Sequence, residues 1–391
     1  MPAADDLALY IHWPFCLKKC PYCDFNSHVR DVVDAEAWQS ALLADMRHEH
    51  ARTGDRRVGS IFFGGGTPSL MPPSLAGALI DEATRLWGLA PDVEITLEAN
   101  PTSYEAAKFA DFRAAGINRV SLGVQSLEDE ALAFLGREHS AVEALAAVES
   151  AQGLFGRVTF DLIYALPGQS AAAWEAQLAR ALAFGTEHLS LYQLTIEPGT
   201  GFAGAVARGR FTPMDADEAA DLFVQTQAQT AAAGLPAYEI SNHARKGAQS
   251  HHNLTYWRYG DYVGIGPGAH GRRGGMATIR HKKPEAFLRR VGENGHGISE
   301  ERVLARDEQL SEALLMGLPA GKATLRMSGA SRPIPCAPTF VLLSDCSRRP
   351  VMRTSHRLRS SRPLPCARSS RAAAPMACPT APPRASCPRC A

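Results

Sequence analysis

Cysteine is missing from a long central part of this chain. None of the nine cysteines lies between residues 24 and 335; three fall within residues 16–23, and the other six lie at positions 336, 346, 366, 378, 387 and 390. A disulfide framework needs cysteines distributed through the folded body, so this spacing excludes one for the central part of the chain. Three cysteines so close together indicate metal or redox chemistry instead.

Long apolar runs are also missing. No run reaches the length that crosses a bilayer, and the first seven residues, MPAADDL, are acidic and lack a basic segment leading into an apolar one. We therefore expect no secretion signal and a cytoplasmic location. With 391 residues, of which 45% are hydrophobic, the chain is long enough for two or three domains with a substantial core.

Acidic residues nearly disappear after residue 318. The segment 319–391 holds 12 Arg and one Lys against a single acid, Asp345, and 12 of the 26 prolines. Its net charge is +12 while the whole chain carries +1, so the first 318 residues carry about −11. No period of 2 or 3.6 is sustained in it, and we predict an unstructured tail.

The composition of this tail resembles that of a GC-rich gene read out of frame after Leu318, where the helical pattern of LSEALLMGL stops abruptly. Resequencing the gene tests this hypothesis, and an intact frame with the same tail would refute it. A basic arm for nucleic acid is the less favoured alternative, because such arms are usually rich in lysine and rarely contain six cysteines. No nucleic-acid partner is expected.

Strand-like and helical segments alternate through the first half of the chain. Apolar runs of strand length lie at 7–12, 58–63, 93–97, 119–124, 158–164 and 189–194, and helical spacing is found at 35–48, 74–87, 104–115, 141–152 and 172–184. This alternation predicts right-handed βαβ units around a parallel sheet. Six units predict an α/β fold, a partial (β/α)6 barrel related to the eight-unit TIM barrel.

A smaller region is expected to follow the barrel. A long helix at 215–233 precedes a short strand-like segment at 237–240, and the Gly- and Tyr-rich sequence up to about residue 275 is expected to cover the open side of the barrel. We therefore predict three parts: a core barrel at 1–235, a C-terminal elaboration at 236–318 and the tail at 319–391.

The three clustered cysteines follow the first predicted strand. Cys16, Cys20 and Cys23 form a C-x3-C-x2-C loop. Iron–sulfur clusters take thiolate ligands, and this short spacing lets one loop hold three corners of a 4Fe-4S cube. The fourth iron is then free for a ligand such as S-adenosylmethionine (SAM), whose amine and carboxylate can chelate it. The alternative is a structural zinc site completed by His12 or His28, but zinc sites usually pair their cysteines as C-x2-C.

Polar groups follow the next four predicted strands. The second strand ends in Gly64, Gly65, Gly66 and Thr67, and the later ones lead to Glu98, to Gln125 with Arg137 twelve residues beyond it, and to Asp161. Each of these taken singly has an ordinary explanation, such as a turn or a solvated carboxylate. Because parallel strands end at one edge of a sheet, a single ligand there can contact several of these groups.

These motifs give the chain a family resemblance over roughly residues 7–318. It resembles the radical SAM proteins grouped with oxygen-independent coproporphyrinogen III oxidase, and most closely their haem-chaperone branch. The matching segments are LYIHWPFCLKKCPYCDFNSH, IFFGGGTPSLM, LEANP, GINRVSLGVQS, LGREHS, FDLIYALPGQ, LSLYQLTIEPGT and HHNLTYWRYGDYVGIGPGAH.

The resemblance implies a role for each group at the strand ends. Tyr10 and Tyr22 border the SAM site, and the methionyl part of SAM is bound by the strand-end turn. The implied residues of that turn are Gly65, Gly66 and Thr67, and the residues implied to complete the pocket are Glu98, Gln125, Arg137 and Asp161.

Two departures weigh against the oxidase. The oxidase has a further cysteine two residues after its cluster motif, where this chain has Phe25, and it carries a longer arm before the first strand. Instead, this chain has an H-N-x-x-Y-W segment, like the one tied to haem binding in the chaperone branch; its named positions are His252, Asn253, Tyr256 and Trp257. Imidazole ligates haem iron and aromatic rings give the macrocycle a flat apolar wall. The alternative is that the two aromatic residues pack on the barrel while His252 caps a turn, and His251 is an equally reachable ligand.

The leading hypothesis is a haem chaperone that binds a 4Fe-4S cluster, SAM and haem and delivers haem to an acceptor protein. The alternative is a radical SAM coproporphyrinogen oxidase, so the question of enzyme activity stays open, and a zinc-stabilised binding module is a third class. An electron donor such as a flavodoxin or ferredoxin is expected, while a membrane-associated acceptor, covalent haem attachment and a homodimer are left open. The family continues after residue 318 with a small folded region that this sequence does not show.

Overall fold

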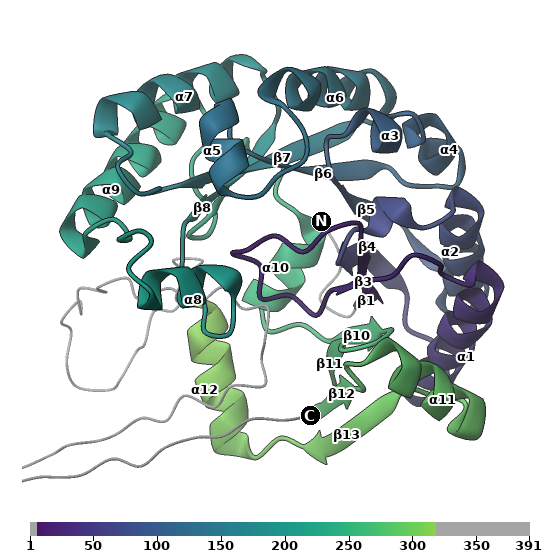
Figure 1. Ribbon diagram of the computed structural model, residues 1–391. Coiled ribbons are helices and arrows are strands. Elements are labelled where there is room, and N and C mark those ends of the chain that lie inside the picture. Colours follow the sequence, from purple (N-terminus) through teal and green to yellow (C-terminus); the bar gives the residue numbers. More distant parts are fainter. Residues whose placement is uncertain (1–5, 318–391) are drawn as a thin grey trace, which may run out of the picture. The chain divides into compact units, whose positions relative to one another are not determined.

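The computed structural model describes residues 6–317 of the chain (Figure 1). The tail at 319–391, and its interpretation as an out-of-frame segment, lie outside the described residues. No helix among residues 6–317 is long and apolar enough to cross a membrane.

Six parallel strands form the centre of the sheet and follow one another in chain order. They are β1 (Leu7–Trp13), β4 (Val58–Gly65), β5 (Leu89–Ala99), β6 (Arg119–Gln125), β7 (Arg157–Tyr164) and β8 (His188–Gln193). The sheet curves into an arc with helices on its outer side (Figure 1). The predicted α/β fold with six strands in an open barrel is confirmed.

The outer helices begin where capping residues place them. Asp34 precedes α1 (Ala35–Thr53) and accepts a hydrogen bond from the backbone of Ala37 at 3.1 Å, and Ser140 forms a capping box at the start of α6 (Ala141–Leu154). Helices α2 (Pro73–Trp87), α7 (Ala171–Ala183) and α9 (Ala216–Ala232) complete the main outer layer, and short helices lie at η1 (Pro68–Leu70), α5 (Asp129–Phe134) and α8 (Gly201–Ala207).

Each strand separates an apolar layer from a polar interior. Ile11, Phe63 and Leu97 are fully buried in the hydrophobic core. The residues next to them in the sequence point the other way, into the barrel, because side chains alternate along a strand. In the register of the sheet Glu98 lies beside Ser121, and Asp161 lies beside Ser190, so the barrel interior is lined with polar groups.

Two predicted elements are wrong in detail. The predicted helix at 104–115 is divided into α3 (Ser103–Ala106) and α4 (Phe109–Ala114), with a turn at Ala107 and Lys108 between them. The predicted strand at 237–240 makes only one isolated bridge, between Ala237 and His243. The strand at this place is β9 (Asn242–Ala244), which pairs antiparallel with β8. Local apolar composition did not distinguish a strand from the turn that precedes it.

The remaining residues extend the sheet at its other edge. After α10 (His251–Trp257), strand β10 (Tyr262–Ile265) pairs parallel with β1, and an antiparallel series follows it. That series is β11 (His270–Arg273), β12 (Met276–Arg280) and β13 (Ile298–Val303), with helices α11 (Pro284–Asn294) and α12 (Arg306–Gly317). The segment expected to cover the open side therefore contributes strands to both edges of the sheet. The division at residue 236 stays a prediction.

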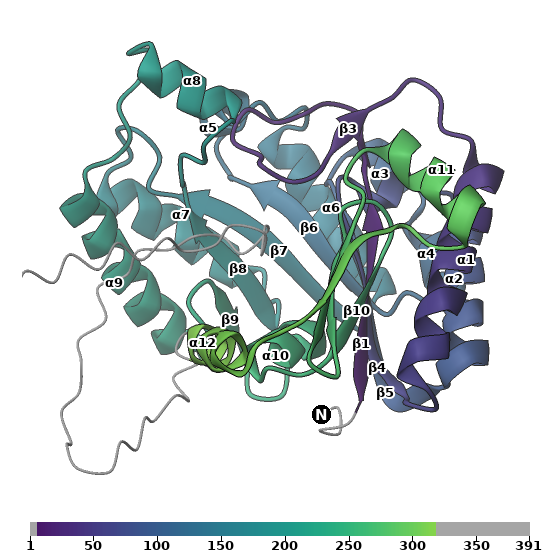
Figure 2. The ribbon, with the colours of Figure 1, turned by 90° about the horizontal axis from the view of Figure 1, so that it is seen from below.

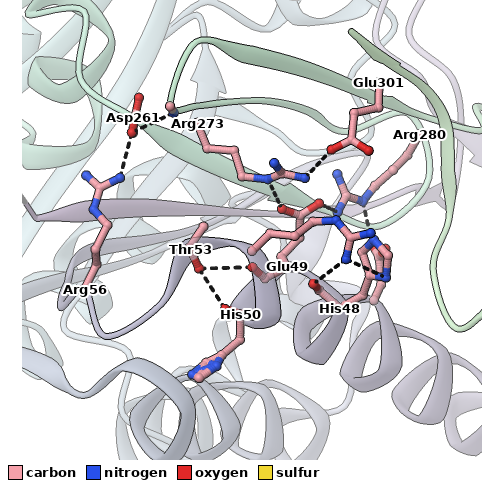
Figure 3. A network of polar contacts seen from close by, with 12 residues as sticks. His48, Glu49, His50, Thr53, Arg56, Asp261, Arg273, Arg280 and Glu301 are labelled. Atoms are coloured by element: carbon pink, nitrogen blue, oxygen red, sulfur yellow. Dashed lines mark hydrogen bonds and ion pairs between the residues drawn. The ribbon is translucent and has the colours of Figure 1, made fainter. Parts of the chain in front are cut away.

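A buried network of charges fastens this edge to α1 (Figure 3). Arg280 donates to Asp45 at 2.5 Å and to Glu49 at 2.9 Å, and Arg273 donates to Glu49 and to Glu301, both at 2.6 Å. Both partners of the Arg280–Asp45 pair are fully buried. Such a pair is costly to break singly, so it fixes the position of the C-terminal strands on the barrel.

Candidate functional site

The three cysteines of the predicted cluster lie in one loop at the carboxyl end of β1. Cys16 ends the short strand β2 (Phe15–Cys16), which pairs with β3 (His28–Val29), so the pairing closes the loop that carries Cys20 and Cys23. All three are free, half-buried thiols. Figure 2 shows this loop, in purple, at the end of the barrel opposite α10.

Hydrogen-bond donors are directed at two of these sulfur atoms. Thr67 Oγ1 donates to Cys16 Sγ, and Arg137 Nη1 donates to Cys20 Sγ, both at 3.4 Å. Burial raises the pKa of the Cys16 thiol and raises that of Cys23 to about 11. Without a bound cation these two thiols are therefore protonated at neutral pH, and metal binding must release their protons.

The spacing of the thiols bears on the kind of metal they hold. Within residues 6–317, no three His, Cys, Asp or Glu side chains are gathered as the ligands of one metal ion would be. The thiolates of a cuboidal cluster bind separate irons and need not converge on one point. The predicted 4Fe-4S cluster therefore does not require such a group of side chains.

The glycine turn after β4 packs directly against the start of this loop. Gly66 donates from its backbone N–H to the carbonyl of Trp13 at 2.7 Å, and Thr67 donates to the carbonyl of Phe15 at 2.8 Å. A Cβ on Gly66 would lie 2.6 Å from the carbonyl oxygen of Phe15, and Gly65 has a φ of +115°. A Cβ at Gly66 would displace backbone, and the φ of Gly65 is one that only glycine adopts readily. The predicted contact of Gly65, Gly66 and Thr67 with SAM stays a prediction.

Two carboxylates lie inside the barrel near its carboxyl end. Glu98 accepts a hydrogen bond from the backbone N–H of Gly65 at 3.2 Å, and Asp161 accepts one from Ser121 Oγ at 3.4 Å. Desolvation, and then the charge of Asp161, raise the pKa of Glu98 to about 8; desolvation raises the pKa of Asp161 to about 6. Both side chains keep some accessible surface, so the pair can receive a cationic ligand.

Arg137 joins the cluster loop to the ends of β5 and β6. Its Nη1 donates to Tyr22 Oη at 3.4 Å, and its Nη2 donates to Asn100 Oδ1 at 2.5 Å and to the carbonyl of Gly123 at 2.9 Å. Gln125, which ends β6, has a φ of 69°, rare for a residue other than glycine. A Cβ on Gly123 would lie 3.0 Å from the Gln125 amide and 3.4 Å from Arg137. The structure thus brings these predicted residues together.

Tyr10 lies on the interior face of β1, close to both the turn and the carboxylates. Its hydroxyl is hydrogen-bonded to His12 Nδ1 at 2.9 Å, and His12 Nε2 donates to the carbonyl of Asn26 in the cluster loop, also at 2.9 Å. Burial lowers the pKa of His12 to about 4, so the ring is neutral and its Nδ1 accepts from Tyr10. Neutral His12 therefore links the cluster loop to the predicted SAM site.

A cavity of about 270 Å³ lies where β7 and β8 end. Two tyrosines, Tyr164 and Tyr192, line it together with Gln193, Ser241 and apolar residues of the loop before α9 and of α9 itself. Burial, and then the negative charge of Asp161, raise the pKa of Tyr192.

The H-N-x-x-Y-W segment forms α10, at the end of the barrel where the strands begin (Figure 2). His252 points inward and is 2% exposed. Its Nδ1 is hydrogen-bonded to Ser60 Oγ at 3.1 Å and its Nε2 to Tyr256 Oη at 3.0 Å. Burial lowers its pKa to about 3. His252 is therefore neutral, and both of its ring nitrogens have partners inside the barrel.

The other residues of this segment are nearer the surface. Asn253 Nδ2 donates to Tyr238 Oη at 3.4 Å, and Trp257 is half-buried with an indole N–H that has no hydrogen-bond partner among residues 6–317. His251 is half-buried, and its Nδ1 likewise has no partner within that range. The structure thus leaves His251 and Trp257 half-buried, each with one buried ring nitrogen that has no partner within that range, while His252 faces the interior.

Three residues that contribute to this arrangement were not selected from the sequence. Asn100 donates from Nδ2 to Thr67 Oγ1 at 3.3 Å, Glu94 accepts from the backbone of His252 at 3.1 Å, and Phe62 stacks on the His252 ring. Asn100 stands in the quoted segment LEANP, so its neighbour Glu98 was the available signal. Nothing in the sequence distinguishes the other two from ordinary strand residues.

Comparison with known proteins agrees with this geometry. The model of the radical SAM superfamily matches residues 10–179. The radical S-adenosyl methionine domain-containing protein 1, mitochondrial, of Bos taurus is 43% identical over 326 residues, which cover 81% of this chain and 74% of that protein. The heme chaperone HemW of Escherichia coli strain K12 is 46% identical over 268 residues, 68% of this chain and 70% of that protein.

A second HemW and one solved structure complete the comparison. The heme chaperone HemW of Bacillus subtilis is 34% identical over 311 residues, 79% of this chain and 82% of that protein. The structure of coproporphyrinogen III oxidase (HemN) from Escherichia coli, a radical SAM enzyme, has a TM-score of 0.69 at 23% identity and covers 81% of this chain and 76% of that one. At this identity the likeness shows the fold alone.

Proposed function

Because the chain belongs to the radical SAM family of HemW haem chaperones, we propose that it binds a 4Fe-4S cluster, SAM and haem and delivers haem to an acceptor protein. The observation that carries the proposal is the single loop of Cys16, Cys20 and Cys23 with Thr67 and Arg137 donating to its sulfur atoms. Donors placed in this way stabilise thiolates, the form that binds iron. When bound, the cluster supplies one-electron chemistry to a SAM molecule on its fourth iron.

The barrel's own residues supply the features that SAM requires. SAM carries a positive sulfonium and a positive ammonium group, and Glu98 and Asp161 offer two carboxylates beside the cluster loop. The Gly65–Gly66 turn exposes backbone groups to a methionyl chain, while Tyr10 and Tyr22 border the space. Gln125 and Arg137 complete the proposed pocket.

The haem site is proposed at α10. A haem iron takes an imidazole nitrogen, and Tyr256 and Trp257 provide aromatic surface on the same helix. His252 must lose its hydrogen bond to Ser60 or to Tyr256 before a ring nitrogen can bind iron. His251, by contrast, is half-buried. These two histidines are the candidate ligands, and Asn253 holds the helix against Tyr238.

The proposed partners follow from this chemistry. Haem and a haem-acceptor protein are required, and the cluster needs an electron donor such as a flavodoxin or ferredoxin. We propose a cytoplasmic location, although the Bos taurus relative is named mitochondrial. A membrane-associated acceptor and a homodimer remain proposals, and no nucleic-acid partner is proposed.

The alternative function is an oxygen-independent coproporphyrinogen III oxidase. The shared fold with the Escherichia coli oxidase supports it only at the level of architecture. The exposed Phe25, where the oxidase has a further cysteine, weighs against it. Formation of protoporphyrinogen by the reconstituted protein with SAM and a reductant would favour the oxidase and count against the chaperone.

The test uses the full chain, reconstituted anaerobically with iron and sulfide and then titrated with haem. We expect a Soret band that shifts or weakens when His252 or His251 is replaced by alanine. The matched control is His296→Ala, which removes a half-buried histidine in the loop between α11 and β13. A wild-type chain with no saturable Soret change would contradict the proposed function.

A further inference from the structure

The rings of Tyr10, Phe62 and His252 form a triad in which each ring contacts the other two. Phe62 is on β4, beside Tyr10 in the register of the sheet, and its ring stacks on the His252 imidazole with centroids 4.9 Å apart and planes 25° apart. The Tyr10 and Phe62 centroids are 6.3 Å apart at the same angle, and Tyr10 is also 6.3 Å from His252. These separations are those of interacting aromatic pairs.

Gly64 has no side chain and so leaves room for the rings of Tyr10 and Phe62. A Cβ at Gly64 would lie 2.9 Å from Cε2 of Tyr10 and 3.0 Å from Cε1 of Phe62. The first glycine of the turn after β4 is thus needed by the two rings, while the next two glycines pack against His12 and Phe15. The turn that meets the cluster loop and the ring triad that meets α10 are parts of one packed unit.

Tyr10 connects the ring triad to the proposed SAM pocket. Tyr10 is hydrogen-bonded to His12, which donates to the cluster loop at Asn26. In the register of the sheet Tyr10 lies beside Phe62 and Phe62 beside Thr96, and Glu98, two residues after Thr96, is on the same face of the sheet. Burial, and then the nearby charge of Glu98, raise the pKa of Tyr10.

His252 connects the ring triad to α10, the helix proposed to bind haem. Glu94 accepts hydrogen bonds from Ser250 Oγ at 3.0 Å and from the backbone N–H of His252 at 3.1 Å. Its other oxygen forms an ion pair with Arg157 at 2.7 Å. The start of α10 is therefore held inside the barrel, and the His252 imidazole cannot move outward without leaving Phe62.

We propose that the triad of Tyr10, Phe62 and His252 couples the two sites, with Phe62 as the ring packed closest to His252, so that SAM in its pocket weakens the binding of haem at α10. This inference rests on the proposed function. For a nitrogen of His252 to bind iron, the ring must separate from Phe62 and from Ser60 or Tyr256. A molecule in contact with Tyr10 restricts the movement of the ring triad, so separating His252 from Phe62 costs more free energy. By linkage, haem must weaken SAM binding by the same factor.

The experiment titrates the anaerobically reconstituted full chain with haem, with and without saturating SAM, and follows the Soret band. We expect the dissociation constant for haem to rise about 5- to 100-fold with SAM, the usual range of such couplings. Phe62→Leu keeps apolar bulk but loses the flat ring. In this variant the dissociation constant for haem should rise by about twofold or less when SAM is added, and this factor is the coupling ratio. Phe184→Leu, a matched aromatic change on the outer side of the barrel, should keep the wild-type ratio.

Reciprocity gives a second measurement that needs no variant. Calorimetric titration of SAM into the wild-type chain, with and without bound haem, should give the same factor. Equal haem affinity with and without SAM, tighter haem binding with SAM, or a full wild-type ratio in Phe62→Leu would each overturn the coupling. If wild-type haem binding is absent altogether, the proposed function fails with it; if haem and SAM both bind independently, only the coupling fails.

Discussion

Arg137 Nη1 donates to Cys20 Sγ at 3.4 Å while its Nη2 donates to the carbonyl of Gly123 at 2.9 Å. One guanidinium therefore fastens the cluster loop to the end of β6. Replacing it leaves the oxygen atoms of Asn100 and Gly123 without these donors.

We predict that Arg137→Ala lowers the free energy of unfolding by about 1.5–3 kcal/mol, the range for hydrogen bonds to charged groups. It should also lower the iron retained per chain after reconstitution, because the cluster loop loses its fastening. Denaturant titration and iron analysis measure the two effects. Arg180→Ala, which removes an exposed pair with Glu128, is the control and should change neither by much. An unchanged iron content in Arg137→Ala would show that the contact does not hold the loop.

The pair Glu98 and Asp161 predicts the pH dependence of SAM binding. Their pKa values are about 8 and about 6, and the cationic ligand favours the ionised forms. Binding must release protons at neutral pH, so SAM affinity should rise as the pH increases from 6 to 8. Calorimetry in buffers of different ionisation enthalpy measures the proton release. Glu98→Gln should bind more weakly and show a flatter profile; a pH-independent wild-type affinity would contradict this assignment.

The free energy of unfolding should fall as the pH rises, whereas SAM affinity should increase. The folded-state pKa of Glu98 lies above its ordinary value of 4.5, so the folded chain holds this proton more tightly than the unfolded chain. Its contribution is fully present below pH 4.5 and is lost as the pH rises through about 8. We predict that Glu98→Gln removes part of the fall in stability over this window, measured by denaturant titration at pH 5 and pH 8.5. If the variant loses stability with pH as steeply as the wild type, Glu98 is not the group responsible.

Gly66 predicts a steric effect at the cluster loop. In Gly66→Ala the new Cβ meets backbone atoms of Phe15 at 2.6–2.9 Å, and backbone cannot turn aside as a flexible side chain does. Overpacking of this kind costs about 1–3 kcal/mol, and iron loading should fall with it. Gly156→Ala is the matched control, since its Cβ would have no atom within 4 Å. Equal melting temperatures and iron contents in the two variants would contradict the proposed packing.

The buried network on α1 predicts a large loss from a single change. In Arg280→Leu, Asp45 and Glu49 keep their places with one fewer cation. Burial alone would raise the pKa of Glu49, but Arg280 and Arg273 outweigh it and hold the pKa below the ordinary value. We expect a loss of about 3–5 kcal/mol in the free energy of unfolding. Arg302→Ala, which breaks only exposed pairs, should cost less than about 1 kcal/mol.

Strand positions and the residues at strand ends were predictable, and the tertiary contacts between them were not. The runs that became β1 and β7 are mostly apolar and buried, and Asp161 stands out as a charged residue within the second of them. By contrast, Phe62 is one more apolar residue in IFFGGG, and its place against His252 depends on a helix 190 positions later. Glu94 likewise has no local signal, since its partners come from β6, β7 and α10.

The same limit explains the outcome at the H-N-x-x-Y-W segment. The sequence placed His251 and His252 on equal terms, whereas the structure turns one inward and leaves the other near the surface. Helical spacing alone fixes their relative directions, but which direction is the interior depends on where Glu94 holds the start of the helix.

The most direct measurement is electron paramagnetic resonance of the reduced, anaerobically reconstituted chain, recorded before and after SAM is added. Cys16, Cys20 and Cys23 as the sole protein ligands of a 4Fe-4S cluster predict about four irons and four sulfides per chain and a cluster signal that changes with SAM, because SAM joins the fourth iron. Zinc without sulfide, or a cluster signal that SAM leaves unaltered, would contradict the account.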